Sequence, residues 1–185
     1  TGLDMAALER SLANLEERGF VVHTGPLELR FTSPIVREVV VDALTPKAAV
    51  SLHAAAGSAL EVVFANDIAE HAVRIATHLY EAGEREKVAT YFAMSGKKRL
   101  LARQLAAAAR DLSRAIELAN ADVRPPGELT EWLSDLADAV RLVRAAPEPF
   151  ELCEKVIARV DAAGTLHDRV TSRIAAGRML AALHA

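Results

Sequence analysis

Two histidines on one helical pattern are the first residues whose spacing could support chemistry. His71 and His78 lie seven residues apart, which places both on the same helix face but about 10 Å apart along the axis. That separation is too long for both to bind one zinc ion without further ligands. We therefore predict no metal site at this pair, and we expect the chain to need no cofactor.

A run of positive charge is the second candidate. Lys97-Lys98-Arg99, followed by Arg103, is the main basic cluster of the sequence. Such a cluster can dock an acidic partner, although a solvated helix face is its more common role. Both interpretations stay open, and we retain Lys97, Lys98, Arg99 and Arg103 as a candidate basic docking patch.

The sequence contains neither a recognisable catalytic-nucleophile motif nor a nucleotide-binding motif. Ser33 and Ser51 are not set in a Gly-x-Ser-x-Gly elbow. Cys153 lies on an apolar stripe without a nearby His or Asn to activate it, which is typical of a buried structural thiol. No Gly-rich loop ends in Gly-Lys-Ser/Thr, the signature of a phosphate-binding loop. We predict a chain that has no enzymatic activity of its own.

Composition sets the broad class. The 185 residues are 51% hydrophobic but only 4% aromatic, so the core must be built largely from Leu, Val, Ile and Ala, and Ala favours helices. The net charge of -3 divides into -3 for residues 1–65, +2 for 66–121 and -2 for 122–185. No apolar run approaches the roughly 20 residues of a membrane span, and we expect a cytoplasmic protein. Because the sequence starts at Thr1 and ends within a helical pattern, we expect it to be part of a longer chain.

Caps and periodicity predict short elements in alternation. Asp4 caps a helix that runs to Arg18, and Gly19 fits the position after its end. Apolar runs at 20–23 and 27–31 flank turn residues and predict a β-hairpin. Ser33-Pro34 combines an N-cap with a proline at the first helical position. Further helices are predicted to begin near residues 46, 68, 84, 105, 129, 149 and 168, the last with Ile174, Gly177 and Leu180 on one face.

The helices suggest a repeat. "HLYEAGEREKVATYFAMS", residues 78–95, fits the later positions of a tetratricopeptide unit. The next matching helix follows too soon for a second full unit, since Ala108 lies only 20 positions after Val88. The Pro and Gly residues of 122–128 favour a joint there.

A longer resemblance covers roughly residues 8–121. Phe31, Arg37-Glu38, Leu52-His53, Leu60-Glu61 and the run 81–84 stand in the order found after the nucleotide-binding module of bacterial STAND-class signalling ATPases. The chain resembles that helical region, which occurs in fusions to serine/threonine kinases, cyclases or LuxR-type regulators. The resemblance implies a winged-helix remnant before tetratricopeptide-like helices, catalysis in domains outside this chain, and a tail that senses a ligand or partner.

Two binding surfaces follow from this frame. The groove-facing residues of the first repeat helix would be Glu70, Val73, Thr77 and Tyr80, a lining that suits a peptide-like ligand. The alternative is that neighbouring helices cover this face, and so short an array favours that alternative. A winged helix can also bind DNA, but acidic residues outnumber basic ones across 1–45, which argues against attraction to phosphates.

The sequence therefore predicts a mainly α protein with three segments: a winged-helix-like segment with a two-stranded hairpin at 1–45, tetratricopeptide-like helices forming an α–α superhelix at 46–121, and further helical repeats at 122–185. The predicted role is a non-catalytic sensor and protein-interaction segment of a multidomain bacterial signalling ATPase or transcriptional regulator. A DNA-binding winged-helix regulator fragment is the alternative.

Overall fold

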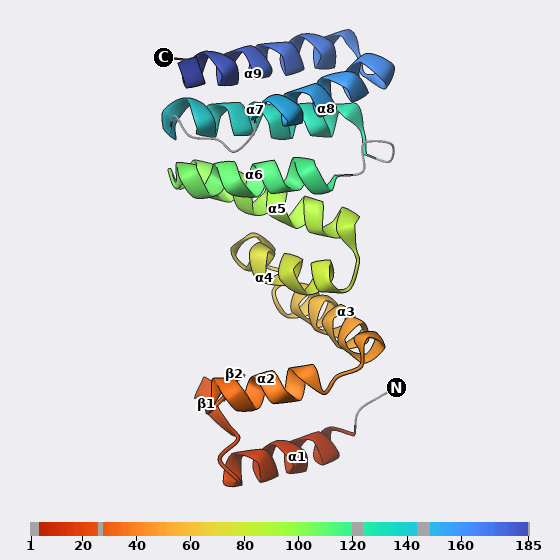
Figure 1. Ribbon diagram of the computed structural model, residues 1–185, viewed down its shortest axis with the longest axis vertical. Coiled ribbons are helices and arrows are strands. Elements are labelled where there is room, and N and C mark those ends of the chain that lie inside the picture. The colour runs from red at the N-terminus through yellow and green to blue at the C-terminus, as the bar shows by residue number, and fades with distance from the viewer. Residues whose placement is uncertain (1–3, 26–27, 120–123, 144–148, 185) are drawn as a thin grey trace. The chain divides into compact units, whose positions relative to one another are not determined.

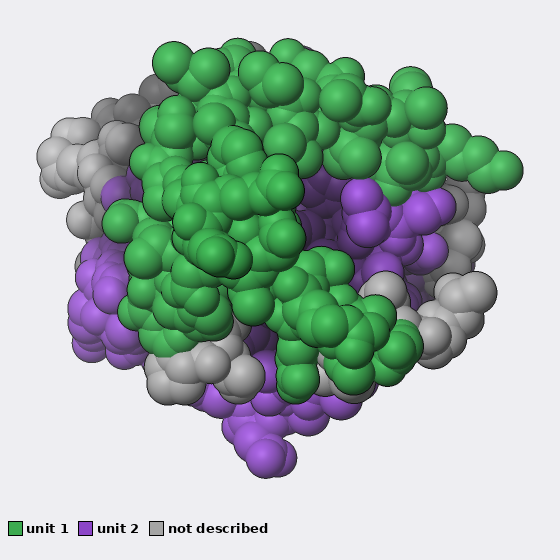
Figure 2. Space-filling model, turned by 90° about the horizontal axis from the view of Figure 1, so that it is seen from below, with its two compact units in different colours: residues 1–49 green, residues 50–185 purple. Residues whose placement is uncertain are grey.

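The computed structural model describes residues 4–25, 28–119, 124–143 and 149–184. The chain divides into two compact units, an N-terminal unit of residues 1–49 and a C-terminal unit of residues 50–185, shown in green and purple in Figure 2. The described residues form nine helices and one two-stranded antiparallel sheet. The predicted mainly α fold with a hairpin is confirmed.

The N-terminal unit follows its local sequence signals. Helix α1 (Met5–Glu17) begins where the Asp4 carboxylate accepts a hydrogen bond from the Ala6 N–H, 3.1 Å away, and Gly19 follows its end with φ +72°. Strands β1 (Val21–Gly25) and β2 (Glu28–Phe31) pair antiparallel. Helix α2 (Pro34–Asp42) begins after Ser33, as predicted, although the Ser33 side chain makes no capping hydrogen bond.

Little of this unit is buried. Among its described residues Val21 is the one buried hydrophobic side chain, and Ile35 and Val39 on α2 are 71% and 63% exposed. The hairpin instead holds to α1 through polar contacts: the Thr32 hydroxyl donates to the Gly19 carbonyl at 2.6 Å, and His23 bonds Glu16 at 2.9 Å. The winged-helix identity of this segment stays a prediction.

The C-terminal unit is a stack of helices. Its elements are α3 (Pro46–Val63, which begins in the N-terminal unit), α4 (Ile68–Glu81), α5 (Arg85–Leu101), α6 (Leu105–Leu118), α7 (Pro126–Val143), α8 (Pro149–Ala163) and α9 (Leu166–His184). From α4 onward each helix packs on the next, and α5, α6 and α7 also contact the helix after that. Figure 1 shows α5 and α6 below α7 and α8, which lie at one level, and α9 above them. No helix among the described residues has the length and apolar composition of a membrane span.

The buried core of this stack forms two clusters, and the partly buried Phe92 and Leu118 pack against both. A small cluster around Ile75, Leu79 and Val88 joins α4 to α5, and a larger one extends from Ala89 to Met179. The predicted joint at 122–128 falls inside this unit, and residues 120–123 lie outside the described part. Helix α7 begins at Pro126, earlier than the predicted start near residue 129, because a proline in the first turn removes no intrahelical hydrogen bond.

The predicted face of the last helix is wrong. Ile174 is 55% exposed and Gly177 is exposed, whereas Ser172, Ala175, Ala176 and Met179 are buried. Large apolar residues and alanines occur on more than one side of this helix, so apolar periodicity does not select a side. Met179 fills the core, whereas Ile174 faces solvent. Helix α3 is mostly exposed, and among its described residues Gly57 is the buried one.

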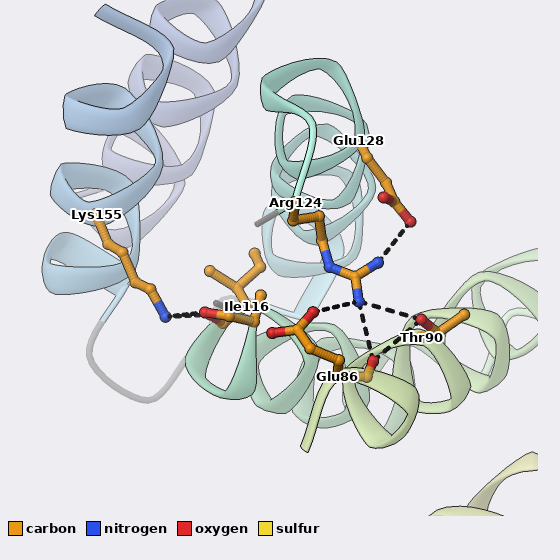
Figure 3. A network of polar contacts seen from close by, with 7 residues as sticks. Glu86, Thr90, Ile116, Arg124, Glu128 and Lys155 are labelled. Atoms are coloured by element: carbon orange, nitrogen blue, oxygen red, sulfur yellow. Dashed lines mark hydrogen bonds and ion pairs between the residues drawn. The ribbon is translucent and has the colours of Figure 1, made fainter. Parts of the chain in front are cut away.

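A buried arginine ties α5 to α7 (Figure 3). Arg124 is 8% exposed, and its guanidinium donates to the Glu86 carboxylate at 3.0 Å, to the Glu86 carbonyl at 2.9 Å and to Glu128 at 2.8 Å. The same group also bonds the Thr90 hydroxyl and lies 4.6 Å from the Trp132 ring centroid. One side chain thereby satisfies groups on two helices that flank α6.

A lysine side chain links α8 to the end of α6. The Lys155 ammonium, on α8, donates to the carbonyls of Ile116, Glu117 and Ala119 at 2.7, 2.9 and 3.0 Å. These carbonyls belong to the last turn of α6, where no helical N–H remains to bond them. Burial lowers the Lys155 pKa, and the nearby Glu117 and Glu86 carboxylates act in the opposite direction.

Gly96→Ala tests how closely α5 and α6 approach. A Cβ at Gly96 would lie 2.6 Å from Leu112 Cγ and 3.2 Å from the Leu112 backbone nitrogen, and overpacking of this kind costs about 1–3 kcal/mol. We expect a lower urea midpoint of unfolding, although alanine is the better helix former. Gly177→Ala is the matched control, because a Cβ there meets nothing within 4 Å and should stabilise by about 1 kcal/mol. Equal gains at both positions would contradict the close approach.

Arg124→Ala tests the α5–α7 tie. Removing one partner of a buried ion pair typically costs 3–5 kcal/mol, and we expect about 3 kcal/mol here because both carboxylates are about one-third exposed. The control is Arg173→Ala, which removes an exposed ion pair with Asp161 and should cost less than about 1 kcal/mol. Chemical denaturation measures both, and similar losses would show that Arg124 is not a tie.

Candidate partner-binding cleft

The four predicted groove residues occupy one side of α4 but have different surroundings. Glu70 and Thr77 are exposed, Val73 is half-buried, and Tyr80 is exposed. The Thr77 hydroxyl donates to the Val73 carbonyl of its own helix at 2.9 Å, so it presents less polar capacity than the sequence suggested. The side of α4 is thus accessible from Glu70 to Tyr80.

Tyr80 has two cations near its ring. The guanidinium carbon of Arg114, on α6, is 5.5 Å from its ring centroid, and that of Arg85, at the start of α5, is 5.9 Å away. Contacts at this range are cation–π interactions worth about 0.5–1 kcal/mol at exposed sites. They hold the ring in place at the far end of the groove.

The basic run divides among three helices. Lys97 pairs with Glu131 on α7, Lys98 pairs with Glu70 on α4, and Arg99 pairs with Asp111 on α6 at 3.0 Å. Consecutive residues point about 100° apart around a helix, so three neighbours in sequence meet three different neighbours in space. The predicted patch is therefore not one surface in the structure.

Arg103 takes a fourth environment. It follows the end of α5 with φ +60° and is exposed, in the left-handed region where glycine usually ends a helix. Its backbone N–H donates to the Leu100 carbonyl at 3.1 Å. Its contribution at this position is helix termination rather than a shared basic surface with Lys97.

One cleft brings the two predicted surfaces together. A cavity of about 350 Å³ lies along α4 and α5, which we call the α4–α5 cleft; its lining residues are Ala69, Glu70, Val73, Ser95, Lys98, Arg99, Ala102 and Gln104. Half of the predicted groove and half of the predicted patch line it. A larger hollow of about 510 Å³ follows α1, but all its lining residues come from that single helix, so it is an open surface.

A buried polar contact forms the rear of the cleft. The Ser95 hydroxyl donates to the Asp111 carboxylate at 2.6 Å, and the same oxygen receives the Arg99 guanidinium. Ser95 and Asp111 are 4% and 7% exposed. Asp111 is not among the residues predicted from the sequence, although a carboxylate inside the apolar stripe of α6, beside Leu112, is a signal of such a buried polar contact.

Cys153 and the tryptophan Trp132 both belong to the packed core. Cys153 is buried, as predicted, and burial raises the pKa of its thiol to about 11, which keeps it protonated at neutral pH. Trp132 is buried in the larger core cluster and carries Arg124 over its ring. Neither residue lines the α4–α5 cleft.

Asp111→Ala tests the rear of the cleft. The change leaves the Ser95 hydroxyl buried without its acceptor, and an unsatisfied buried group costs about 1–3 kcal/mol. We expect a stability loss of about 2 kcal/mol in thermal or urea unfolding. Adding Ser95→Ala removes the orphaned hydroxyl, so the double variant should be less destabilised than the sum of the single changes. Simple additivity would show that the two side chains are not coupled.

Comparison with protein-family models, with curated proteins and with solved structures finds no match for this chain. The candidate site is therefore defined by its own geometry. That geometry is an open cleft lined by the half-buried Val73, by the exposed Lys98–Glu70 pair and by Arg99, which pairs with the buried Asp111.

Proposed function

We propose that the chain is a non-catalytic interaction and sensor segment that binds an acidic, peptide-like part of a protein partner in the α4–α5 cleft. The observation that carries the proposal is the pair of cations, Lys98 and Arg99, that line a cleft with the half-buried Val73. A carboxylate and an apolar side chain of a bound peptide would each find a complement there.

The two cations are suited to this role for different reasons. The Lys98–Glu70 pair is about half exposed, and exposed ion pairs contribute little free energy, so a ligand carboxylate can replace Glu70 at small cost. Arg99 is oriented by the buried Asp111. A guanidinium has five N–H donors, so this contact does not exhaust its capacity to bind a ligand.

The wider setting of the proposal is a multidomain bacterial signalling ATPase of the STAND class. The order of helix, hairpin and helix before a helical stack supports a winged-helix-like segment followed by tetratricopeptide-like repeats. In that setting the chain acts in the cytoplasm, and any ATPase, kinase or cyclase activity belongs to other domains. Partner binding at the cleft would then alter how the helical tail restrains those domains.

Charge argues against the DNA-binding alternative. The N-terminal unit, which would have to contact DNA, contains seven acidic and five basic residues. Nonspecific attraction to the phosphate backbone requires a basic surface. We therefore place the binding function in the C-terminal unit, where the cleft lies.

Selection of peptides by display against the folded 185-residue chain tests the proposal. We expect the selected peptides to be acidic, because the cleft presents Lys98 and Arg99. Lys98→Ala should weaken a selected peptide about tenfold, which is the scale of one charge-assisted hydrogen bond, whereas Glu70→Ala should tighten it by freeing Lys98. Fluorescence anisotropy measures both affinities.

Lys47→Ala is the matched control, since Lys47 is an exposed lysine of the N-terminal unit and its loss should leave the affinity unchanged. A labelled DNA duplex, titrated over a salt series, is the competing ligand. Tight DNA binding that falls steeply with salt would overturn the proposal, and so would peptides whose affinity ignores both Lys98 and Glu70.

A further inference from the structure

Two histidines outside the cleft face each other across α3 and α4. The Nδ1 atoms of His53 and His78 are 3.1 Å apart, and the ring centroids are 5.1 Å apart with a tilt of 42°. Both side chains are half-buried. In the sequence His78 shares a helix face with His71, two turns away, but the structure brings it to His53, which lies 25 residues earlier in the chain.

Two packing contacts between α3 and α4 hold the histidines in this position. Gly57, one turn after His53 on α3, packs against Leu79 so closely that a Cβ there would lie 2.6 Å from Leu79 Cδ2. At the far end of α3, Phe64 stacks on His71 with ring centroids 3.6 Å apart. These two contacts set the position of α3 along α4, and hence the register that brings the imidazoles together.

The spacing of the two nitrogens matches a shared metal ion. Two imidazole nitrogens bound tetrahedrally to zinc at about 2.0–2.1 Å lie roughly 3.3 Å from each other. An open cavity of about 270 Å³, lined by Leu52, His53, Ala56 and His78, adjoins the pair. It leaves room for water to complete the coordination.

A positive charge lies near the pair. The Arg74 guanidinium, also on α4, is close enough to act electrostatically on His78, so it opposes a bound cation and limits the affinity.

We propose that His53 and His78 form a two-imidazole site for a late first-row transition ion such as Zn²⁺ or Cu²⁺. The described residues contain no cluster of three or more His, Cys, Asp or Glu side chains placed to hold a metal, so water supplies the other ligands. The bound ion links α3 to α4. This inference is independent of the proposed partner-binding function.

The linkage has a structural consequence. Helix α3 is held to its neighbours by few side-chain contacts, which include the histidine pair, the Gly57–Leu79 contact and the Tyr91 hydroxyl donating to Glu61 at 2.6 Å. A metal bridge adds a strong contact to a lightly attached helix. The ion thus fixes the first helix of the stack.

Titration of tag-free chain with Zn²⁺ tests the site. We expect one equivalent to bind and to raise the thermal unfolding midpoint by several degrees. His53→Gln and His78→Gln should each weaken Zn²⁺ binding at least tenfold in calorimetry. His167→Gln is the matched control, because it removes an exposed histidine of α9 and should leave binding unchanged. Arg74→Gln should tighten binding severalfold by removing the opposing charge.

Electron paramagnetic resonance of bound Cu²⁺ gives a readout that does not depend on stability. Two nitrogen ligands should appear in the wild-type spectrum and one at most in either glutamine variant, with folding checked by circular dichroism. Absence of binding at millimolar Zn²⁺ and Cu²⁺ would overturn the proposal. A spectrum and affinity unchanged by both substitutions would also overturn it.

Discussion

The helical stack depends on two places where a missing side chain lets helices approach. At Gly96 the space that a Cβ would need is filled by Leu112 of α6, and at Gly57 it is filled by Leu79 of α4. Both candidate sites lie beside these contacts. Ser95 and Arg99 flank Gly96 and reach Asp111 because α6 is so near, and His53 meets His78 one turn from Gly57. The same close packing thus shapes the core and positions the polar groups.

Cationic side chains link alternate helices of the stack. Arg124 joins the start of α7 to α5, Lys155 joins α8 to α6, and Arg178 joins α9 to Asp138 on α7 at 3.2 Å. Each of these links skips one helix. Helices α7 and α9 pack directly on each other, and one large core cluster runs from α5 to α9. The cationic side chains add polar links between alternate helices to this apolar packing.

The starts of the helices could be predicted from adjacent residues, whereas contacts between residues far apart in the sequence could not. Asp4, Ser33 and Pro34 marked helix starts correctly because capping and proline geometry depend only on adjacent residues. The buried side of α9 was mispredicted because its Ala-rich sequence has no distinct apolar period. The contacts of Arg124 were not predicted because its partner Glu86 lies 38 residues away in the sequence. Nothing in local spacing encodes such a pair.

Basic residues that are adjacent in the sequence need not form one basic surface, as residues 97–99 show. The three cations radiate from one helix toward α7, α4 and α6, and each meets a carboxylate. Arg99 is one-third exposed and pairs with the buried Asp111 carboxylate. If Arg99 moved to a ligand carboxylate, Asp111 would lose its charge partner, which is costly for a buried group. Lys98 and Glu70 form a pair near solvent that can open without burying a charge. A ligand carboxylate would therefore engage Lys98 first, with Arg99 as a fixed second donor. In the proposed function, this difference in burial would set the order in which the two cations meet a ligand.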